Sequence, residues 1–244
     1  MRLALLTDIH GNAEALGACL AQARAAGIEQ FVILGDLVGY GPDPRAIVDT
    51  VSGLAASGAI VLMGNHDEAI AAGAGGMNVS AAQCINWARG ELSVAQRTYL
   101  AGLPMTHRQG DILFVHASAA EPREWHYIDN PQAAVQSLNA TDARLTFCGH
   151  THLPVVFHRL PGKRVQAFVP VPERQMPFSQ ARRYLSVVGS VGQPRDHDPR
   201  ACWGELDDQG LTLHRVAYDI DATVRKIKAA GLPEWIGLRL YQGR

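Results

Sequence analysis

Five short apolar runs end at residues that can bind a metal ion, and this feature restricts the fold more than any other. Helical patterns, with apolar residues three and four positions apart, fill 13–26 and 44–57, between the first three runs. Continuous apolar runs that alternate with helices are typical of a parallel sheet covered on both faces. The sequence therefore predicts an α/β fold. The runs lie at 2–7, 31–34, 60–63, 112–115 and 145–148.

The rest of the chain changes from helical to mostly extended. A glycine-rich loop at 71–79 precedes helical patterns at 81–89 and 93–102, which we interpret as a small helical insert around 71–105. No repeat or linker interrupts the sequence, so we predict a single domain over 1–244. Turn signals after 154 predict two hairpins, and a final helix fits the C-terminal part. These elements are expected at 155–160 with 165–170, 201–206 with 211–218, and 221–230.

Residues that can bind metal ions follow the apolar runs. In open α/β sheets, ligands bind in the crevice at the carboxyl ends of the strands, so residues far apart in sequence can converge there. A lone histidine at a strand end is more often structural than a ligand, but the coincidence at five strand ends predicts one common site. The residues are Asp8, His10, Asp36, Asn65, His66, His116, His150 and His152.

This mixture of side chains suits a pair of divalent ions. Imidazole binds transition metals well, and a carboxylate can bridge two cations. Two ions about 3.5–4 Å apart can clamp a phosphoryl group and lower the pKa of a shared water. Asp8 and Asp36 cancel two of the four positive charges, and a hydroxide cancels one more. The neutral Asn65 preserves the remaining positive charge, which attracts a phosphate group.

These residues occur in motifs that resemble the signature of the calcineurin-like metallophosphoesterase superfamily, in matching order over 1–220. Two further segments, at 35–44 and 189–196, resemble its small bacterial and archaeal phosphodiesterase branch. The resemblance implies a four-layer αββα sandwich with two mixed β-sheets. The motifs are Asp8-Ile9-His10, Gly35-Asp36, Gly64-Asn65-His66-Asp67, the isolated His116, and Gly149-His150-Thr151-His152.

The resemblance also implies a role for each motif residue. Asp36 would bridge two metal ions, and His66 would donate a hydrogen bond or proton to the substrate. Asp67 would either orient His66 or cap the following helix. One ion would be held by Asp8, His10, Asp36 and His152, and the other by Asp36, Asn65, His116 and His150.

The implied reaction is in-line attack by a hydroxide that bridges the metals, on a phosphodiester or a small phosphorylated metabolite or nucleotide. We expect two divalent transition-metal ions, with Mn²⁺ in vitro and Fe, Zn or Ni as alternatives. A phosphomonoesterase or nucleotide pyrophosphatase could use the same centre. A non-catalytic scaffold, like one retromer subunit that resembles this fold, is disfavoured because every proposed ligand and His66 are present.

The chain departs from the protein phosphatases of this superfamily at the second motif. Those enzymes carry an aspartate and an arginine where this sequence has Gly39 and Tyr40. The aspartate that would support the catalytic histidine and the arginine that would grip a phosphoprotein are therefore both replaced. Symmetric diadenosine tetraphosphatases share that pattern and are disfavoured as well. The segment around Tyr40 reads as a strand-to-helix turn rather than a substrate contact.

Substrate contacts outside the ligand set are less distinct. Asn65 and Asn12 can reach a phosphate oxygen, although Asn12 also fits as a helix N-cap, which we favour. Arg195 is either a bidentate phosphate contact or a solvated loop residue. Trp87 and Tyr99 suit packing better than a nucleotide pocket. The remaining histidines are expected to be structural or at the surface: His107, His126, His158, His197 and His214.

Charge and cysteine content restrict the partners. The 22 Lys and Arg residues nearly balance the 23 Asp and Glu, which excludes an extended nucleic acid held on a basic surface. A small phosphorylated substrate remains compatible, because metal ions can supply local positive charge. The four cysteines are 54 or more positions apart, as expected for reduced thiols. With no apolar stretch long enough for a signal peptide or a membrane span, we predict a cytoplasmic protein without membrane contact.

Overall fold

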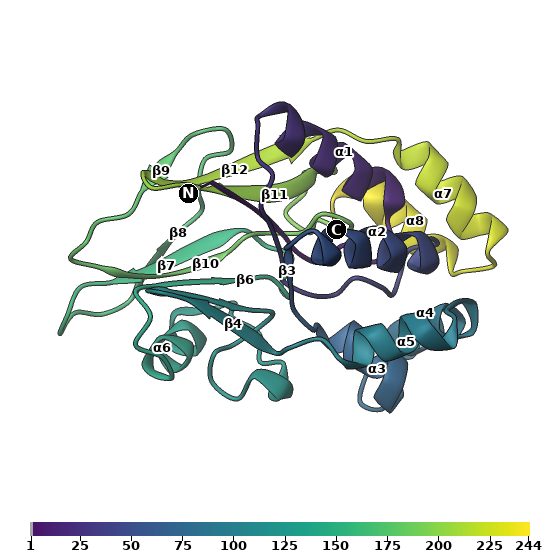
Figure 1. Ribbon diagram of the computed structural model, residues 1–244, viewed down its shortest axis with the longest axis horizontal. Helices are drawn as coiled ribbons and strands as arrows, with labels where there is room; N and C mark the ends of the chain where they lie inside the picture. Colours follow the sequence, from purple (N-terminus) through teal and green to yellow (C-terminus); the bar gives the residue numbers. More distant parts are fainter. Residues whose placement is uncertain (1) are drawn as a thin grey trace.

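Two six-stranded mixed sheets form the centre of the molecule (Figure 1). The computed structural model describes residues 2–244. The first sheet has the order β3 (Ile60–Val61), β2 (Phe31–Ile33), β1 (Leu3–Leu6), β11 (Ala201–Leu206), β12 (Gly210–Val216) and β9 (Met176–Pro177). The second has the order β4 (Thr106–Gln109), β5 (Ile112–Val115), β6 (Leu145–Cys148), β10 (Arg183–Val187), β7 (Val155–Arg159) and β8 (Gln166–Phe168).

Each sheet contains three parallel strands. β1, β2 and β3 are parallel in the first sheet, and β5, β6 and β10 are parallel in the second. Antiparallel hairpins extend both sheets, including the two that the turn signals predicted. Every strand that leads into the candidate site belongs to one of the parallel sets. Their carboxyl ends therefore present the following residues at one edge.

Helices cover the outer faces of both sheets. α1 (Ala13–Ala25) and α2 (Pro44–Ala56) pack on the first sheet through a core that includes Leu16, Ile33 and Val48. α6 (Pro131–Asn139) covers the second sheet through Ala134 and Leu138. Side chains of both sheets share the central core, as the cluster of Leu5, Val32, Phe114, Phe147 and Val156 shows. The predicted αββα layers are thus confirmed.

Two helical additions flank the candidate site. α3 (Asn65–Ala72), α4 (Val79–Glu91) and α5 (Val94–Ala101) pack together, and the helices expected at 81–89 and 93–102 are confirmed as α4 and α5. α7 (Ile220–Ala229), which was predicted, pairs with α8 (Glu234–Gln242), which was not. A short 3-10 helix spans Pro122–Glu124.

Four other elements also differ from the sequence-based expectation. The helix expected after Asp67 is α3, which was given no bounds and starts within the third metal-binding motif, and β3 is correspondingly shorter than the run at 60–63. α6 was missed although Asn130 caps it and Pro131 occupies its first turn, a recognisable start signal. β4 has no apolar run, because it is a largely exposed edge strand.

All four cysteines are buried and free. Within residues 2–244, no helix combines the length and apolar character needed to cross a bilayer.

Candidate metal centre

The backbone turns sharply where the parallel strands end, and this places the candidate ligands. Five of them adopt the left-handed backbone region, with φ values between 49° and 70°. Such conformations are unfavourable for residues other than glycine and cluster at functional sites. They bring side chains from separate strands into one small volume. The five residues are Asp8, His10, Asp36, His150 and His152.

Glycines allow these turns to approach one another. A Cβ atom on Gly64 would lie 2.2 Å from Oδ1 of Asp36, and one on Gly149 would lie 2.3 Å from Oδ2 of Asp8. No other residue fits at either position without displacing a carboxylate. The glycine that precedes each of these motifs is therefore part of how the site is built.

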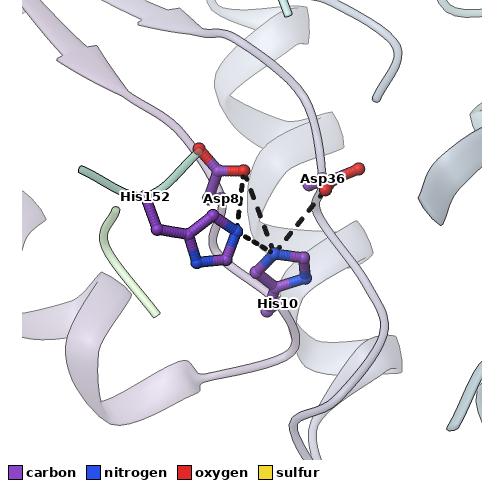
Figure 2. Close-up of side chains that lie close together, drawn as sticks. All are labelled: Asp8, His10, Asp36 and His152. Atoms are coloured by element: carbon purple, nitrogen blue, oxygen red, sulfur yellow. Dashed lines mark hydrogen bonds and ion pairs between the residues drawn. The ribbon is translucent and has the colours of Figure 1, made fainter. Parts of the chain in front are cut away.

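The first group of side chains comprises Asp8, His10, Asp36 and His152, all almost completely buried (Figure 2). Nε2 of His152 lies 3.1 Å from Nε2 of His10 and 3.3 Å from Oδ1 of Asp8. Oδ2 of Asp36 lies 3.6 Å from Nε2 of His10. Four ligand atoms thus face one point, although the residues come from three separate parts of the chain.

The second group shares Asp36 and adds His116 and His150. Oδ2 of Asp36 lies 3.4 Å from Nε2 of His116, which lies 3.2 Å from Nδ1 of His150. Asn65 stands at the start of α3, and its buried Oδ1 has no hydrogen-bond partner among the described residues. A buried amide oxygen left unpaired is costly unless something outside the polypeptide satisfies it.

Backbone carbonyls fix the four histidine rings. A carbonyl oxygen only accepts, so the ring nitrogen facing it carries the proton and the other nitrogen points into the cluster. The donating nitrogens are Nδ1 of His10 to Val38 at 3.2 Å, Nδ1 of His116 to Leu34 at 2.8 Å, Nδ1 of His152 to Gln193 at 2.7 Å, and Nε2 of His150 to Trp125 at 2.8 Å.

The electrostatics of the cluster favour a positive charge at its centre. Burial raises the pKa of both aspartates, but the neighbouring histidines outweigh burial and hold each carboxyl below its usual pKa, so both are anionic. Burial opposes a charge on His116, yet the Asp36 carboxylate prevails and raises its pKa to about 9. Two buried carboxylates thus attract a cation, and without a metal ion the proton on His116 takes that place. This donor set fits divalent transition-metal ions.

The sequence matches the model of the calcineurin-like phosphoesterase superfamily domain over residues 1–209. The chain belongs to the calcineurin-like phosphoesterase superfamily. It is 35% identical to a metallophosphoesterase from Sphaerobacter thermophilus, whose crystal structure superposes with a TM-score of 0.87 and 100% coverage of both chains. It is 31% identical to an uncharacterised protein of Methanocaldococcus jannaschii, over 99% of this chain and 98% of that protein.

A hypothetical protein from Pyrococcus horikoshii is 22% identical, with a TM-score of 0.78 and coverage of 100% of this chain and 98% of that one. It shares the fold. Members of the superfamily use divalent metal ions, and the two buried groups described above are where this member can hold them.

His66 stands beside the cluster rather than within either group. Its ring centroid lies 4.7 Å from that of His10 and 4.8 Å from that of Tyr40. Burial lowers the pKa of His66, so the ring is neutral. A Cβ atom on Gly39 would lie 2.2 Å from Nδ1 of His66, so the glycine at this position makes room for the ring. In the superfamily's protein phosphatases, an aspartate stands at this position.

Asp67 caps α3. Its Oδ2 accepts the backbone N–H of Gly64 and its Oδ1 accepts that of Leu37, both at 2.9 Å. Nδ1 of His66 has no partner among the described residues, so Asp67 does not hold that ring through a hydrogen bond at this nitrogen. The structure thus supports the cap, and the orienting role of Asp67 stays a prediction.

Asn12 and Arg195, the proposed substrate contacts outside the ligand sets, differ in how far their side chains are used within the fold. Asn12 is the N-cap of α1, with Oδ1 accepting from Ala15 and Nδ2 donating to Gly192, both at 3.0 Å. Its amide is used within the fold, in agreement with the favoured N-cap role, and a phosphate contact by Asn12 stays a prediction. Arg195 lies next to the first group, where its backbone N–H donates to the carbonyl of His152, and it forms no ion pair with any described residue. Its Nη2 donates to Oε1 of Gln193 at 3.1 Å, whereas its buried Nε has no partner among the described residues and remains a donor for a substrate.

The other side chains weighed from the sequence lie outside the cluster. Trp87 and Tyr99 pack against the hydrophobic core, as favoured. None of the other five histidines joins either metal-binding group in the part of the chain described.

A segment that the sequence did not single out also shapes the site. The 121–127 segment follows β5, and the carbonyl of its Trp125 accepts from Nε2 of His150. Nε1 of Trp125 donates to Oε2 of Glu68 on α3, at 2.9 Å. The ring of Tyr127 stacks on His150 with centroids 4.2 Å apart and planes 15° apart. No motif marks these residues, because their role depends on contacts between distant parts of the chain.

A cleft of about 810 Å³ opens beside the second group. Asn65, His66 and His150 line its inner end, next to the candidate ligands. Its walls come from α3, the loop between α3 and α4, and the 121–127 segment. The size is in the range typical of small-molecule sites.

Proposed function

We propose that this protein hydrolyses phosphodiesters with two divalent metal ions. The observation that carries this proposal is the pair of buried groups that share Asp36, in which every histidine bonds a carbonyl through one ring nitrogen and turns the other inward. The cleft beside them is large enough for a small phosphorylated substrate.

Asp36 would bridge the two ions. One ion would be held by Asp8, His10, Asp36 and His152, and the other by Asp36, Asn65, His116 and His150. When bound, the ions supply positive charge for the phosphoryl group and lower the pKa of the attacking water. The unpaired Oδ1 of Asn65 is the strongest sign that the second set accepts a ligand, because every other polar group there has a partner in the fold or faces the cluster.

His66 would supply the proton for the leaving oxygen. Its ring lines the cleft next to Asn65, and burial keeps it neutral, so it has an N–H to donate. Arg195 would bind a nonbridging phosphoryl oxygen from the side of the first group, because it lies beside His152 without a carboxylate partner.

The charge of the surroundings supports a diester over a monoester. A diester carries one negative charge and a monoester carries two near neutral pH. The charged side chains that line the cleft are Glu68, Arg123 and Glu124, and Arg123 is already paired with Glu68. The side chains that line the cleft thus add no unpaired cation to the metal ions. A singly charged group fits this supply better than a dianion.

The test is hydrolysis of bis(p-nitrophenyl) phosphate by the purified protein with added Mn²⁺. We expect activity in the wild type, and its loss in Asp36→Ala and His66→Ala. His197→Ala is the matched control, because His197 is exposed and belongs to neither group. Wild-type rates in Asp36→Ala and His66→Ala with metal still bound would refute the proposal.

A substrate panel separates the related activities. We expect kcat/KM to be higher for simple diesters than for p-nitrophenyl phosphate or for dinucleoside polyphosphates. A preference for the monoester or the pyrophosphate bond would assign the same centre to a monoesterase or pyrophosphatase instead. Parallel assays with Mn²⁺, Fe²⁺, Zn²⁺ and Ni²⁺ would rank the ions, and we propose Mn²⁺ as the most active in vitro.

We further propose that residues 1–244 act as one domain in the cytoplasm. The four buried free thiols support a reducing compartment. Partners other than a small phosphorylated substrate are not part of this proposal.

A further inference from the structure

We propose that the exposed face of Tyr127 is a stacking platform for a flat, uncharged ring carried by one substituent of the substrate's phosphorus. This inference rests on the proposed function and adds a substrate class to it, namely diesters with an aryl or nucleoside group.

The Tyr127 ring packs on the candidate ligand His150 and also lines the cleft. One face covers His150 in a nearly parallel stack, with centroids 4.2 Å apart. The residue is nevertheless 54% exposed, so its other face is open. His150 turns Nδ1 toward the second group, which places the platform one ring thickness from a candidate metal ligand. A substituent on a phosphoryl group bound there can reach it.

The cleft beside Tyr127 has room for such a ring. Its volume of about 810 Å³ exceeds what a phosphate group alone requires. Small and apolar side chains form one part of the lining, and aromatic residues form another. This combination suits a planar group better than a chain of charged groups. The apolar part consists of Ala69, Ala72, Met77 and Ala81.

The charges around the cleft argue against a second phosphate on the substituent. Glu68 and Glu124 contribute two carboxylates to the lining, against the single guanidinium of Arg123. Arg123 and Glu68 form an ion pair, so that guanidinium is not free for another anion. The charged side chains of the lining thus carry a net negative charge. An uncharged ring avoids the repulsion that a distal phosphate would meet there.

The platform is held in place before any ligand arrives. Trp125 is bonded to Glu68 through its indole N–H and to His150 through its carbonyl. Trp125 also has a left-handed backbone, with φ of 53°, which turns the chain toward Tyr127. A preorganised aromatic surface loses little conformational freedom on binding.

Phosphonates with a single substituent test this inference directly. Binding of phenylphosphonate, cyclohexylphosphonate and methylphosphonate to the Mn²⁺-loaded protein would be measured by calorimetry. Phenyl and cyclohexyl differ in flatness rather than size. We expect the phenyl compound to bind roughly fivefold more tightly than the cyclohexyl one, as one aromatic stack would give. Adding a charge, as in 4-carboxyphenylphosphonate, should weaken binding relative to the phenyl compound.

Variants separate stacking from general effects on the site. Tyr127→Phe should keep the preference for phenyl over cyclohexyl, and Tyr127→Val should abolish it. Methylphosphonate binding serves as the internal reference for any disturbance of His150. Tyr241→Val is the matched control, because Tyr241 is exposed on α8 and does not line the cleft.

The outcomes separate this inference from the proposed function. A phenyl preference that persists in Tyr127→Val, or that is absent in the wild type while methylphosphonate binds, would overturn the platform alone. If no phosphonate binds and no diester is hydrolysed, both the platform and the proposed function fail.

Discussion

The two groups of candidate ligands are held in different ways. The first group is enclosed, with Asp8, His10 and His152 at most 2% exposed and none of them lining the 810 Å³ cleft. The second group meets that cleft through Asn65 and His150. His152 is fixed by a carbonyl in a buried loop beside β10, whereas His150 is fixed by the 121–127 segment, which is largely exposed.

This difference predicts that the two groups bind their metal ions with different affinity. A ligand set fixed by buried backbone holds its geometry whether or not a substrate is present. A set that depends on an exposed segment is easier to disturb. We therefore expect the first group to bind its ion more tightly, and the second to be the one that responds to changes around the cleft.

The largest expected effect comes from removing one histidine from each group. His150→Ala should keep about one tightly bound Mn²⁺ per chain after gel filtration, because the first group stays intact. His152→Ala should keep less than one, since the remaining set is open to the cleft. Loss of an outer hydrogen-bond partner costs about 10–100-fold in metal affinity or activity, so loss of a ligand itself should lower kcat/KM by at least that factor.

Metal content by mass spectrometry and hydrolysis of bis(p-nitrophenyl) phosphate would measure both quantities. His197→Ala is again the reference for an unrelated histidine. Equal retention of metal in His150→Ala and His152→Ala would break the comparison between the groups.

A smaller effect is expected from Glu68, which touches no candidate ligand. Glu68→Ala removes the acceptor of the Trp125 indole and so loosens the support of His150. We expect Mn²⁺ affinity of the second group to fall by about 10-fold, at the lower end of the range for outer-shell partners, and that of the first group to stay unchanged. A two-step Mn²⁺ titration would show this as a shift of the weaker step only.

Glu68→Gln is the matched variant, because its amide oxygen can still accept from Trp125. Glu68→Gln should restore most of the Mn²⁺ affinity of the second group. If Glu68→Ala leaves both Mn²⁺ affinities unchanged, the 121–127 segment does not influence metal binding by the second group.

The same contrast between the groups appears in what the sequence could predict. Asp8, His10 and Asp36 stand directly after apolar runs, and parallel strands place such residues together whatever the rest of the chain does. Their convergence was therefore predictable. Glu68 meets Trp125 across 57 positions in sequence, through an irregular segment without an apolar pattern. No local sequence pattern indicates such a contact.

Asn12 shows the same limit of sequence-based prediction, because only one of its two contacts could be predicted. Its cap of α1 was predictable from position, but the contact of Nδ2 with the carbonyl of Gly192 spans 180 residues. That second bond ties the amide into the fold. Local patterns thus identified which residues gather at the strand ends, and long-range packing decided which of them remain free to act.

Asp67 gives the smallest expected effect on metal binding and activity, because its carboxylate supports α3 rather than His66. Both of its oxygens accept backbone N–H groups. Asp67→Asn keeps the shape but turns an amide N–H₂ toward one of those donors, leaving one bond unmade at a buried position. This should lower the free energy of unfolding by about 1–3 kcal/mol, measured by urea denaturation. Metal affinities and the pH profile of kcat should stay as in the wild type. A changed pH profile at unchanged metal content would instead support the orienting role, because a carboxylate that orients His66 would alter the ring's proton affinity when neutralised.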